Sequence, residues 1–141
     1  MQVTYKDYII TDDKRKLDIQ AVTDCLSRTY WAHNRSHDRI VKSIEGSVCY
    51  SVLHESKQIG FARVVTDGAT MYYLADVFIV EECRGEGIGK KLVEVIVNQP
   101  EYEGLTGILG TLDAHALYEQ YGFEREPERL MRRAAQPIIS Q

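Results

Sequence analysis

The stretch from residue 77 to residue 97 combines three patterns in a fixed order. An apolar, mostly β-branched run covers 77–80, glycines recur at every second position from Gly85 to Gly89, and apolar residues then follow at helical spacing. The first run predicts a buried strand and the last predicts a helix. Glycines let the backbone turn tightly and approach a ligand, and the free N–H groups of a first helical turn attract anions. We therefore expect an α/β domain built around an anion-binding loop.

The glycine pattern also fits an ordinary strand-to-helix connection, and two nucleotide-binding motifs fit it poorly. A Walker loop requires a lysine followed by serine or threonine after its last glycine, whereas Gly89 precedes Lys90 and Lys91. The dinucleotide motif requires Gly-x-Gly-x-x-Gly, but the glycines here are spaced by two throughout. The pattern that does fit is Arg-x-x-Gly-x-Gly, read as Arg84-Gly85-Glu86-Gly87-Ile88-Gly89.

This pattern resembles the pyrophosphate-binding signature of the GNAT superfamily of acetyl-coenzyme A-dependent N-acetyltransferases. A second segment, Leu117-Tyr118-Glu119-Gln120-Tyr121-Gly122-Phe123, is similar to the family's Leu/Phe-Tyr-Glu-x-x-Gly-Phe segment and follows at a similar distance. The resemblance covers nearly the whole chain. It implies a mixed, mostly antiparallel central sheet that is splayed into a V, with helices on both faces.

The order of apolar periods and turn residues predicts the elements along the chain. We expect one domain over 1–136 and a loose tail over 137–141. Ser36 is a candidate cap for a helix that ends at Gly46, and Gly122 is a candidate end for the last helix. The predicted strands are 3–10, 47–54, 58–66, 71–80, 105–112 and 129–133, and the predicted helices are 14–30, 36–45, 90–97 and 113–121.

Composition and the first residues of the sequence argue against several classes of function. The net charge of −4 gives no support for nucleic-acid binding. No apolar run reaches the ~18 residues of a membrane span, and the first residues lack the layout of a signal peptide. The three cysteines are widely separated and lack metal-ligand spacing. We expect reduced thiols, no metal and a cytoplasmic protein.

The resemblance implies acetyl-coenzyme A as co-substrate. Its phosphates would meet the main chain of the glycine loop and the Arg84 side chain, while a bulge in the preceding strand would offer main-chain groups to the pantetheine arm and the thioester. A plain core strand is the alternative for that run, and the family often has proline where Glu81 stands. The predicted cofactor-binding residues are Val77, Phe78, Ile79, Arg84, Gly85, Gly87, Gly89 and Lys90.

Two residues are candidates for proton transfer. The resemblance implies that Tyr118 is the general acid that protonates the departing coenzyme A thiolate; the alternative is that Tyr118 packs on the sheet with its hydroxyl bonded to an inert group. Asp76 lies on an apolar strand, where a carboxylate is costly unless it is paired or used. It is a candidate base or substrate anchor, with a paired structural carboxylate as the alternative. Family members often carry an asparagine near Asp113, which this chain lacks, so Asp113 is expected only to cap a helix.

The function expected from these residues is direct transfer of an acetyl group to a primary amine of a small molecule or peptide. The acceptor would be selected by the first half of the chain, the 31–35 loop and the Tyr72-Tyr73 strand. One alternative is a non-catalytic acyl-coenzyme A sensor, and another is an interaction protein that uses a sheet edge or helix face. No nucleic acid or membrane partner is expected, and a homodimer is left open.

Overall fold

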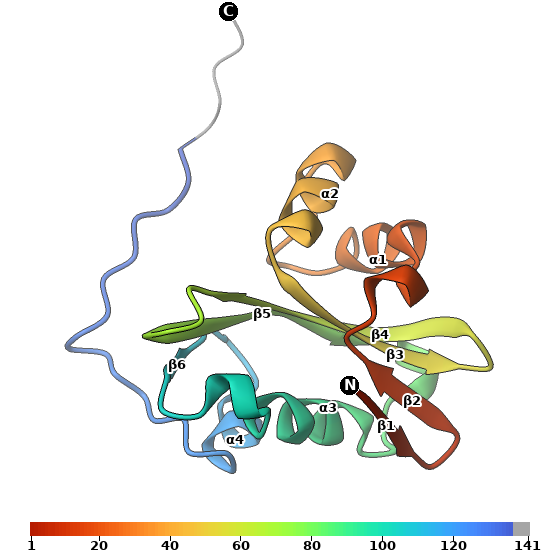
Figure 1. The fold of residues 1–141 in the computed structure, drawn as a ribbon. Coiled ribbons are helices and arrows are strands. Elements are labelled where there is room, and N and C mark those ends of the chain that lie inside the picture. Colours follow the sequence, from red (N-terminus) through yellow and green to blue (C-terminus); the bar gives the residue numbers. More distant parts are fainter. Residues whose placement is uncertain (137–141) are drawn as a thin grey trace, which may run out of the picture.

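The centre of the molecule is a six-stranded sheet. The computed structural model describes residues 1–136, so the predicted tail over 137–141 lies outside the described residues. The strands lie side by side in chain order, and each neighbouring pair is antiparallel except β5 and β6, which are parallel (Figure 1). The strands are β1 (Gln2–Tyr5), β2 (Tyr8–Thr11), β3 (Val48–His54), β4 (Lys57–Thr66), β5 (Met71–Ile79) and β6 (Thr106–Ile108).

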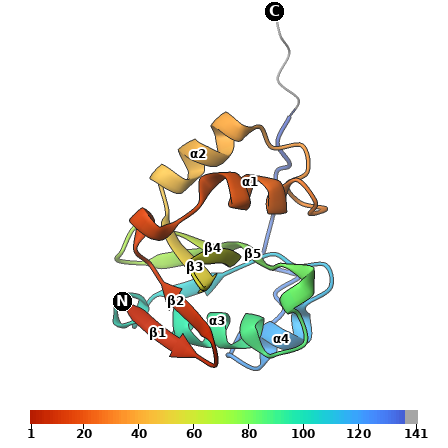
Figure 2. The same ribbon diagram turned by 90° about the vertical axis from the view of Figure 1, so that its right-hand side faces the viewer.

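Helices cover both faces of this sheet, as predicted. The helices α1 (Ile19–Leu26) and α2 (His37–Glu45) lie on one face, and α3 (Ile88–Val97) and α4 (His115–Glu119) lie on the other (Figures 1 and 2). Each pair of helices seals its own apolar core. The core under α1 and α2 includes Val22, Ile40 and Phe61, while that under α3 and α4 includes Leu92 and Tyr118. None of the helices within residues 1–136 is long and apolar enough to cross a membrane.

The sheet opens into a V because β6 is short. β6 pairs only with the first three residues of β5, from Met71↔Thr106 to Tyr73↔Ile108. β5 continues to Ile79, and within residues 1–136 its later part has a strand partner only on the β4 side. No strand covers the main-chain groups on the other edge of that part within residues 1–136.

Helix ends follow the local sequence. Asp18 accepts a hydrogen bond from the Ala21 N–H at the start of α1, and Ser36 accepts one from the Arg39 N–H at the start of α2. Such side chains satisfy donors that have no partner inside the helix. After α4, Gly122 adopts φ 87°, and the Phe123 N–H reaches back to the Tyr118 carbonyl at 3.3 Å. This is the Schellman arrangement that a glycine after a helix predicts.

The predicted elements differ from the structure mainly near the two ends. The strand predicted over 3–10 is a hairpin, because Lys6 adopts φ 51° and turns the chain between β1 and β2. The helix predicted over 14–30 is a 3-10 turn (Lys14–Lys16) followed by α1, which begins after the Asp18 cap and ends at Leu26.

The C-terminal predictions were also too long. The strand predicted over 105–112 shortens to β6. The helix predicted over 113–121 shortens to α4, and the expected cap at Asp113 is wrong, because α4 follows Ala114 and no side chain of the described residues caps it. The strand predicted over 129–133 is wrong. Leu130 and Met131 are 58% and 95% exposed there, so the segment lacks the buried side that a strand requires.

Candidate functional site

The glycine loop leads from the end of β5 into α3 through a short 3-10 turn (Glu81–Cys83). Gly85 and Gly87 adopt φ 89° and 80°, a region that other residues enter only with strain. Gly87 is the residue before α3 and supplies no side-chain cap, and the first turn of α3 holds no acidic residue. The N–H groups of that turn therefore keep their positive potential.

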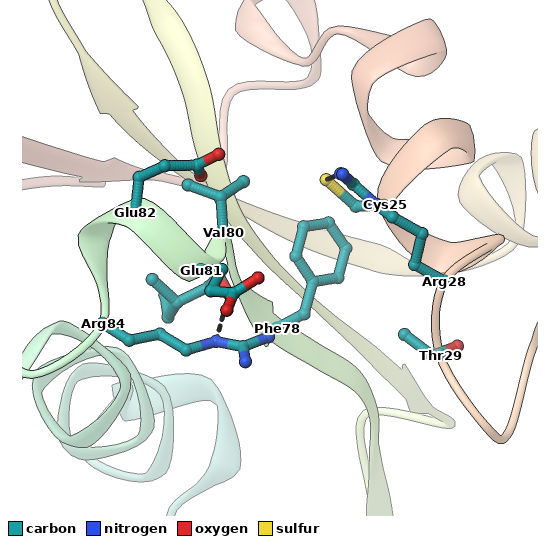
Figure 3. Close-up of a pocket in the computed structure, with 9 residues that line it drawn as sticks. Cys25, Arg28, Thr29, Phe78, Val80, Glu81, Glu82 and Arg84 are labelled. Atoms are coloured by element: carbon teal, nitrogen blue, oxygen red, sulfur yellow. Dashed lines mark hydrogen bonds between the residues drawn. The ribbon is translucent and has the colours of Figure 1, made fainter.

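Arg84 lies at the junction of the loop and β5. Its Nε donates a hydrogen bond to the Ile79 carbonyl at 3.0 Å, so the guanidinium is held against the end of the strand. A cavity of about 240 Å³ opens beside this pair, between the end of α1 and the end of β5 (Figure 3). The structure thus brings together Arg84 and two of the predicted strand residues, Phe78 and Ile79. The cavity is lined by Cys25, Arg28, Thr29, Phe78, Ile79, Val80, Glu81, Glu82 and Arg84.

The predicted bulge is present in β5 and is centred slightly earlier than expected. Arg63 pairs with Ala75, and Phe61 pairs with Phe78, so one residue of β4 lies opposite two residues of β5. The inserted pair is Asp76 and Val77, and Asp76 adopts φ 55°. The extra residue reverses the alternation of the strand, because Leu74 packs in the core under α3 whereas Phe78 packs in the core under α1.

The Asp76 carboxylate is bonded to three side chains. Its Oδ1 accepts from the Trp31 indole N–H at 2.9 Å, and its Oδ2 accepts from Arg35 at 2.8 Å and from Arg63 at 2.9 Å. The Asp76 side chain is 2% exposed. These contacts tie the loop between α1 and α2 to the bulge, and they favour the paired structural carboxylate among the roles considered for Asp76.

Sequence reasoning missed the partners of Asp76. Trp31 and Arg35 were assigned only to a substrate loop. A signal for Arg63 was present, because it interrupts the apolar run of β4 and a charged residue in such a run needs a partner. The sequence could not show which carboxylate would supply that partner.

Tyr118 lies on α4, on the face of the sheet opposite to α1. Its side chain borders a second cavity, of about 950 Å³, formed by β6, α4 and the segment that follows α4. Burial, reinforced by nearby Tyr30 and Asp113, raises the pKa of Tyr118 to about 12. The hydroxyl is therefore protonated at neutral pH, which is the state that a general acid requires.

Tyr30 connects the two arms of the V, and sequence reasoning gave it no role. Its hydroxyl accepts a hydrogen bond from the Leu112 N–H at 3.3 Å, which links the loop after α1 to the loop after β6. Its ring packs edge-on against Trp31 with ring centres 5.0 Å apart. Because Trp31 is bonded to Asp76, the bulge, the α1–α2 loop and the β6–α4 loop form one connected group.

Comparisons with known proteins agree with this arrangement. The sequence profile of the acetyltransferase (GNAT) domain family matches residues 45–125. A solved structure from Xanthomonas campestris pv. campestris, described as belonging to the GNAT family, is 35% identical, with a TM-score of 0.88 over 94% of this chain and 96% of that one. A GNAT acetyltransferase from Elizabethkingia anophelis, solved with acetyl-CoA bound, shares the fold with a TM-score of 0.65 and 17% identity over 85% of this chain and 78% of that one.

Among curated proteins, the chain is 26% identical to a candidate acetyltransferase from Gibberella zeae over 66% of this chain and 64% of that protein. It is 36% identical to GCN5-related N-acetyltransferase 2 of Arabidopsis thaliana over 52% of this chain and 30% of that protein. The chain thus spans less than two thirds of either relative. The matched profile, which covers more than half of the chain, and the shared fold establish that this chain belongs to the GNAT acetyltransferase family.

Proposed function

We propose that this protein transfers an acetyl group from acetyl-coenzyme A to a primary amine of a small molecule or peptide. The observation that carries the proposal is the uncapped N-terminus of α3, preceded by two glycines at positive φ and placed directly after a bulged strand with one free edge. This arrangement offers main-chain donors to a diphosphate and main-chain groups to an extended thioester arm.

The diphosphate would bind at the loop. The main-chain N–H groups of Gly85, Gly87, Gly89 and Lys90 are the candidate donors, because backbone donors at a helix start bind anions irrespective of side-chain type. Arg84 adds a guanidinium beside them, although its Nε is already bonded to Ile79. Acetyl-coenzyme A, when bound, would supply the thioester that reacts, and the protein would supply position and electrostatic stabilisation.

The thioester would lie along the free edge of β5. Main-chain groups of Val77, Phe78 and Ile79 are the candidate partners for the arm and for the carbonyl oxygen, which gains negative charge when the amine attacks. Tyr118 is the candidate acid for the departing thiolate, since its raised pKa keeps the hydroxyl protonated. We assign Asp76 to holding the bulge and the α1–α2 loop in place rather than to taking the proton of the ammonium, because its oxygens are already bonded to three donors.

The test is to measure thioester consumption from acetyl-coenzyme A with a panel of amines, together with the Kd of coenzyme A by calorimetry. Binding with amine-dependent turnover is the expected result. Binding without turnover for any amine would favour the acyl-coenzyme A sensor. Absence of binding would overturn the proposal and favour an interaction protein.

A further inference from the structure

The β1–β2 hairpin holds the glycine loop through a single residue, Glu86. The Tyr5 hydroxyl and the Lys6 ammonium both donate to the Glu86 carbonyl, at 2.9 Å and 2.8 Å. The Tyr8 hydroxyl donates to the Glu86 carboxylate at 2.7 Å. The main chain and the side chain of Glu86 are therefore both fixed by residues about 80 positions earlier in the chain.

The contacts to Glu86 fix the orientation of the peptide bond between Glu86 and Gly87. Glu86 lies between Gly85 and Gly87, which both adopt positive φ. Glycines restrict the backbone little, so the loop needs other contacts to hold one conformation. In a trans peptide, the carbonyl of one residue and the N–H of the next point in opposite directions. Holding the Glu86 carbonyl toward the hairpin therefore directs the Gly87 N–H away from the hairpin. That N–H is one of the predicted diphosphate donors.

The hairpin also fixes the position of the Glu86 carboxylate. A free carboxylate next to a diphosphate would weaken binding by like-charge repulsion. Here the Glu86 carboxylate is bonded to Tyr8, and this hydrogen bond is the main cause that raises the pKa of the Tyr8 hydroxyl. Tyr8 thus remains a proton donor that keeps the carboxylate on the hairpin side. The fit is close, because a Cβ added to Gly87 would lie 2.9 Å from the Tyr5 hydroxyl oxygen.

We propose that the β1–β2 hairpin is the positioning element of the coenzyme's diphosphate site, with Tyr5 and Lys6 orienting the Gly87 N–H through Glu86. The inference rests on the proposed function and assigns a role to a part of the chain outside the matched family region, which begins at residue 45. Tyr5, Lys6 and Tyr8 are positioning residues, since they act through Glu86.

The decisive variant is Tyr5→Phe/Lys6→Met, which removes both donors to the Glu86 carbonyl. Without these donors the Gly87 N–H is no longer held toward the diphosphate, so the Kd of coenzyme A is expected to rise about tenfold. The Kd of pantetheine, which lacks the diphosphate, is expected to stay within about twofold. A general loss of structure would weaken both ligands equally, so a change in the ratio of the two Kd values reports a loss confined to the diphosphate site.

Tyr102→Phe is the matched control. It also removes a tyrosine hydroxyl bonded to another residue, Tyr50, at 2.6 Å, a bond that does not involve Glu86. We expect this variant to lose stability and to leave the ratio of Kd values unchanged. Tyr5→Phe alone removes one of the two donors without changing the charge, so it keeps the test informative if the double variant fails to fold.

The outcomes separate the two proposals. If wild-type protein binds no coenzyme A, the proposed function and this inference both fall. If wild-type protein binds coenzyme A and the Tyr5 and Lys6 variants bind it equally well, the proposed function stands and the hairpin has no positioning role. An equal loss of coenzyme A and pantetheine affinity would also overturn the inference.

Discussion

Tyr118 is the residue whose chemistry can be tested most directly. No hydrogen bond is among the causes of its raised pKa, and Tyr118→Phe keeps the ring, so this variant should leave folding and the Kd of coenzyme A nearly unchanged. As a general acid it should contribute about 10²- to 10⁴-fold, so kcat is expected to fall by that range. Turnover measured beside binding checks this prediction, and an unchanged kcat would remove Tyr118 from the mechanism.

The pH dependence follows from the same residue. With a pKa of about 12, Tyr118 holds its proton in the free enzyme across the neutral and mildly alkaline range and would lose it only near pH 12. The acid form is therefore fully present at pH 7 to ~10. Between pH 7 and ~10, we expect the pH profile of kcat/KM to have the same shape in the wild-type protein and in Tyr118→Phe. A decline near pH 8 that disappears in the variant would contradict the assigned pKa.

Asp76 makes the opposite prediction. Asp76→Asn keeps the shape but removes the charge that faces Arg35 and Arg63, and breaking a buried pair in this way typically costs about 3–5 kcal/mol. Because both arginines are partly exposed, we expect about 2–3 kcal/mol from urea unfolding. Asp24→Asn, on the surface of α1, is the control and should change stability by less than about 0.5 kcal/mol. A stable Asp76→Asn protein with lost turnover would restore Asp76 as the base.

At the scale of elements, two helix-terminal glycines form a natural pair. Gly122 follows α4 at φ 87°, whereas Gly46 follows α2 at φ −90°. An added Cβ meets nothing within 4 Å at Gly122 and only the Lys42 carbonyl at 3.7 Å at Gly46. Steric contacts of a new methyl group would therefore be similarly small at the two positions. Gly122→Ala should cost about 1–2 kcal/mol of strain, while Gly46→Ala should be neutral or slightly stabilising. Equal effects in urea unfolding would show that φ is not the cause.

The ends of helices could be predicted where one residue type strongly favours the local backbone conformation. Ser36, Gly46 and Gly122 mark helix ends because their side chains, or the lack of one, suit those positions. The hairpin at Lys6 could not be predicted, because a lysine at positive φ leaves no local signal in the sequence.

The same limit applies to the site. The glycine loop could be predicted because a positive φ requires glycine at two positions. The bonds of Asp76 to Trp31, Arg35 and Arg63 join residues from 13 to 45 positions apart, and only tertiary structure selects such partners.

At the scale of the whole molecule, binding of coenzyme A should raise the free energy of unfolding. A ligand that binds only the folded state stabilises it by about 2.7 kcal/mol at a concentration one hundred times its Kd. For a chain of this size we therefore expect coenzyme A to raise Tm by several degrees, and the Tyr5→Phe/Lys6→Met variant to require about tenfold more ligand for the same rise. Pantetheine, titrated in parallel, is the control. A Tm independent of coenzyme A would contradict the prediction.

The hydrogen bonding of β2 with β3 has a consequence for truncated forms of the protein. A fragment cut to the family match, residues 45–125, would lack β1, β2, α1 and α2. It would bare the edge of β3 that β2 covers and uncover the apolar residues that α1 and α2 bury, both of which promote association between chains. It would also leave Glu86 without Tyr5, Lys6 and Tyr8. The most recognisable portion of this sequence is thus expected to self-associate and to bind the coenzyme more weakly than the full chain.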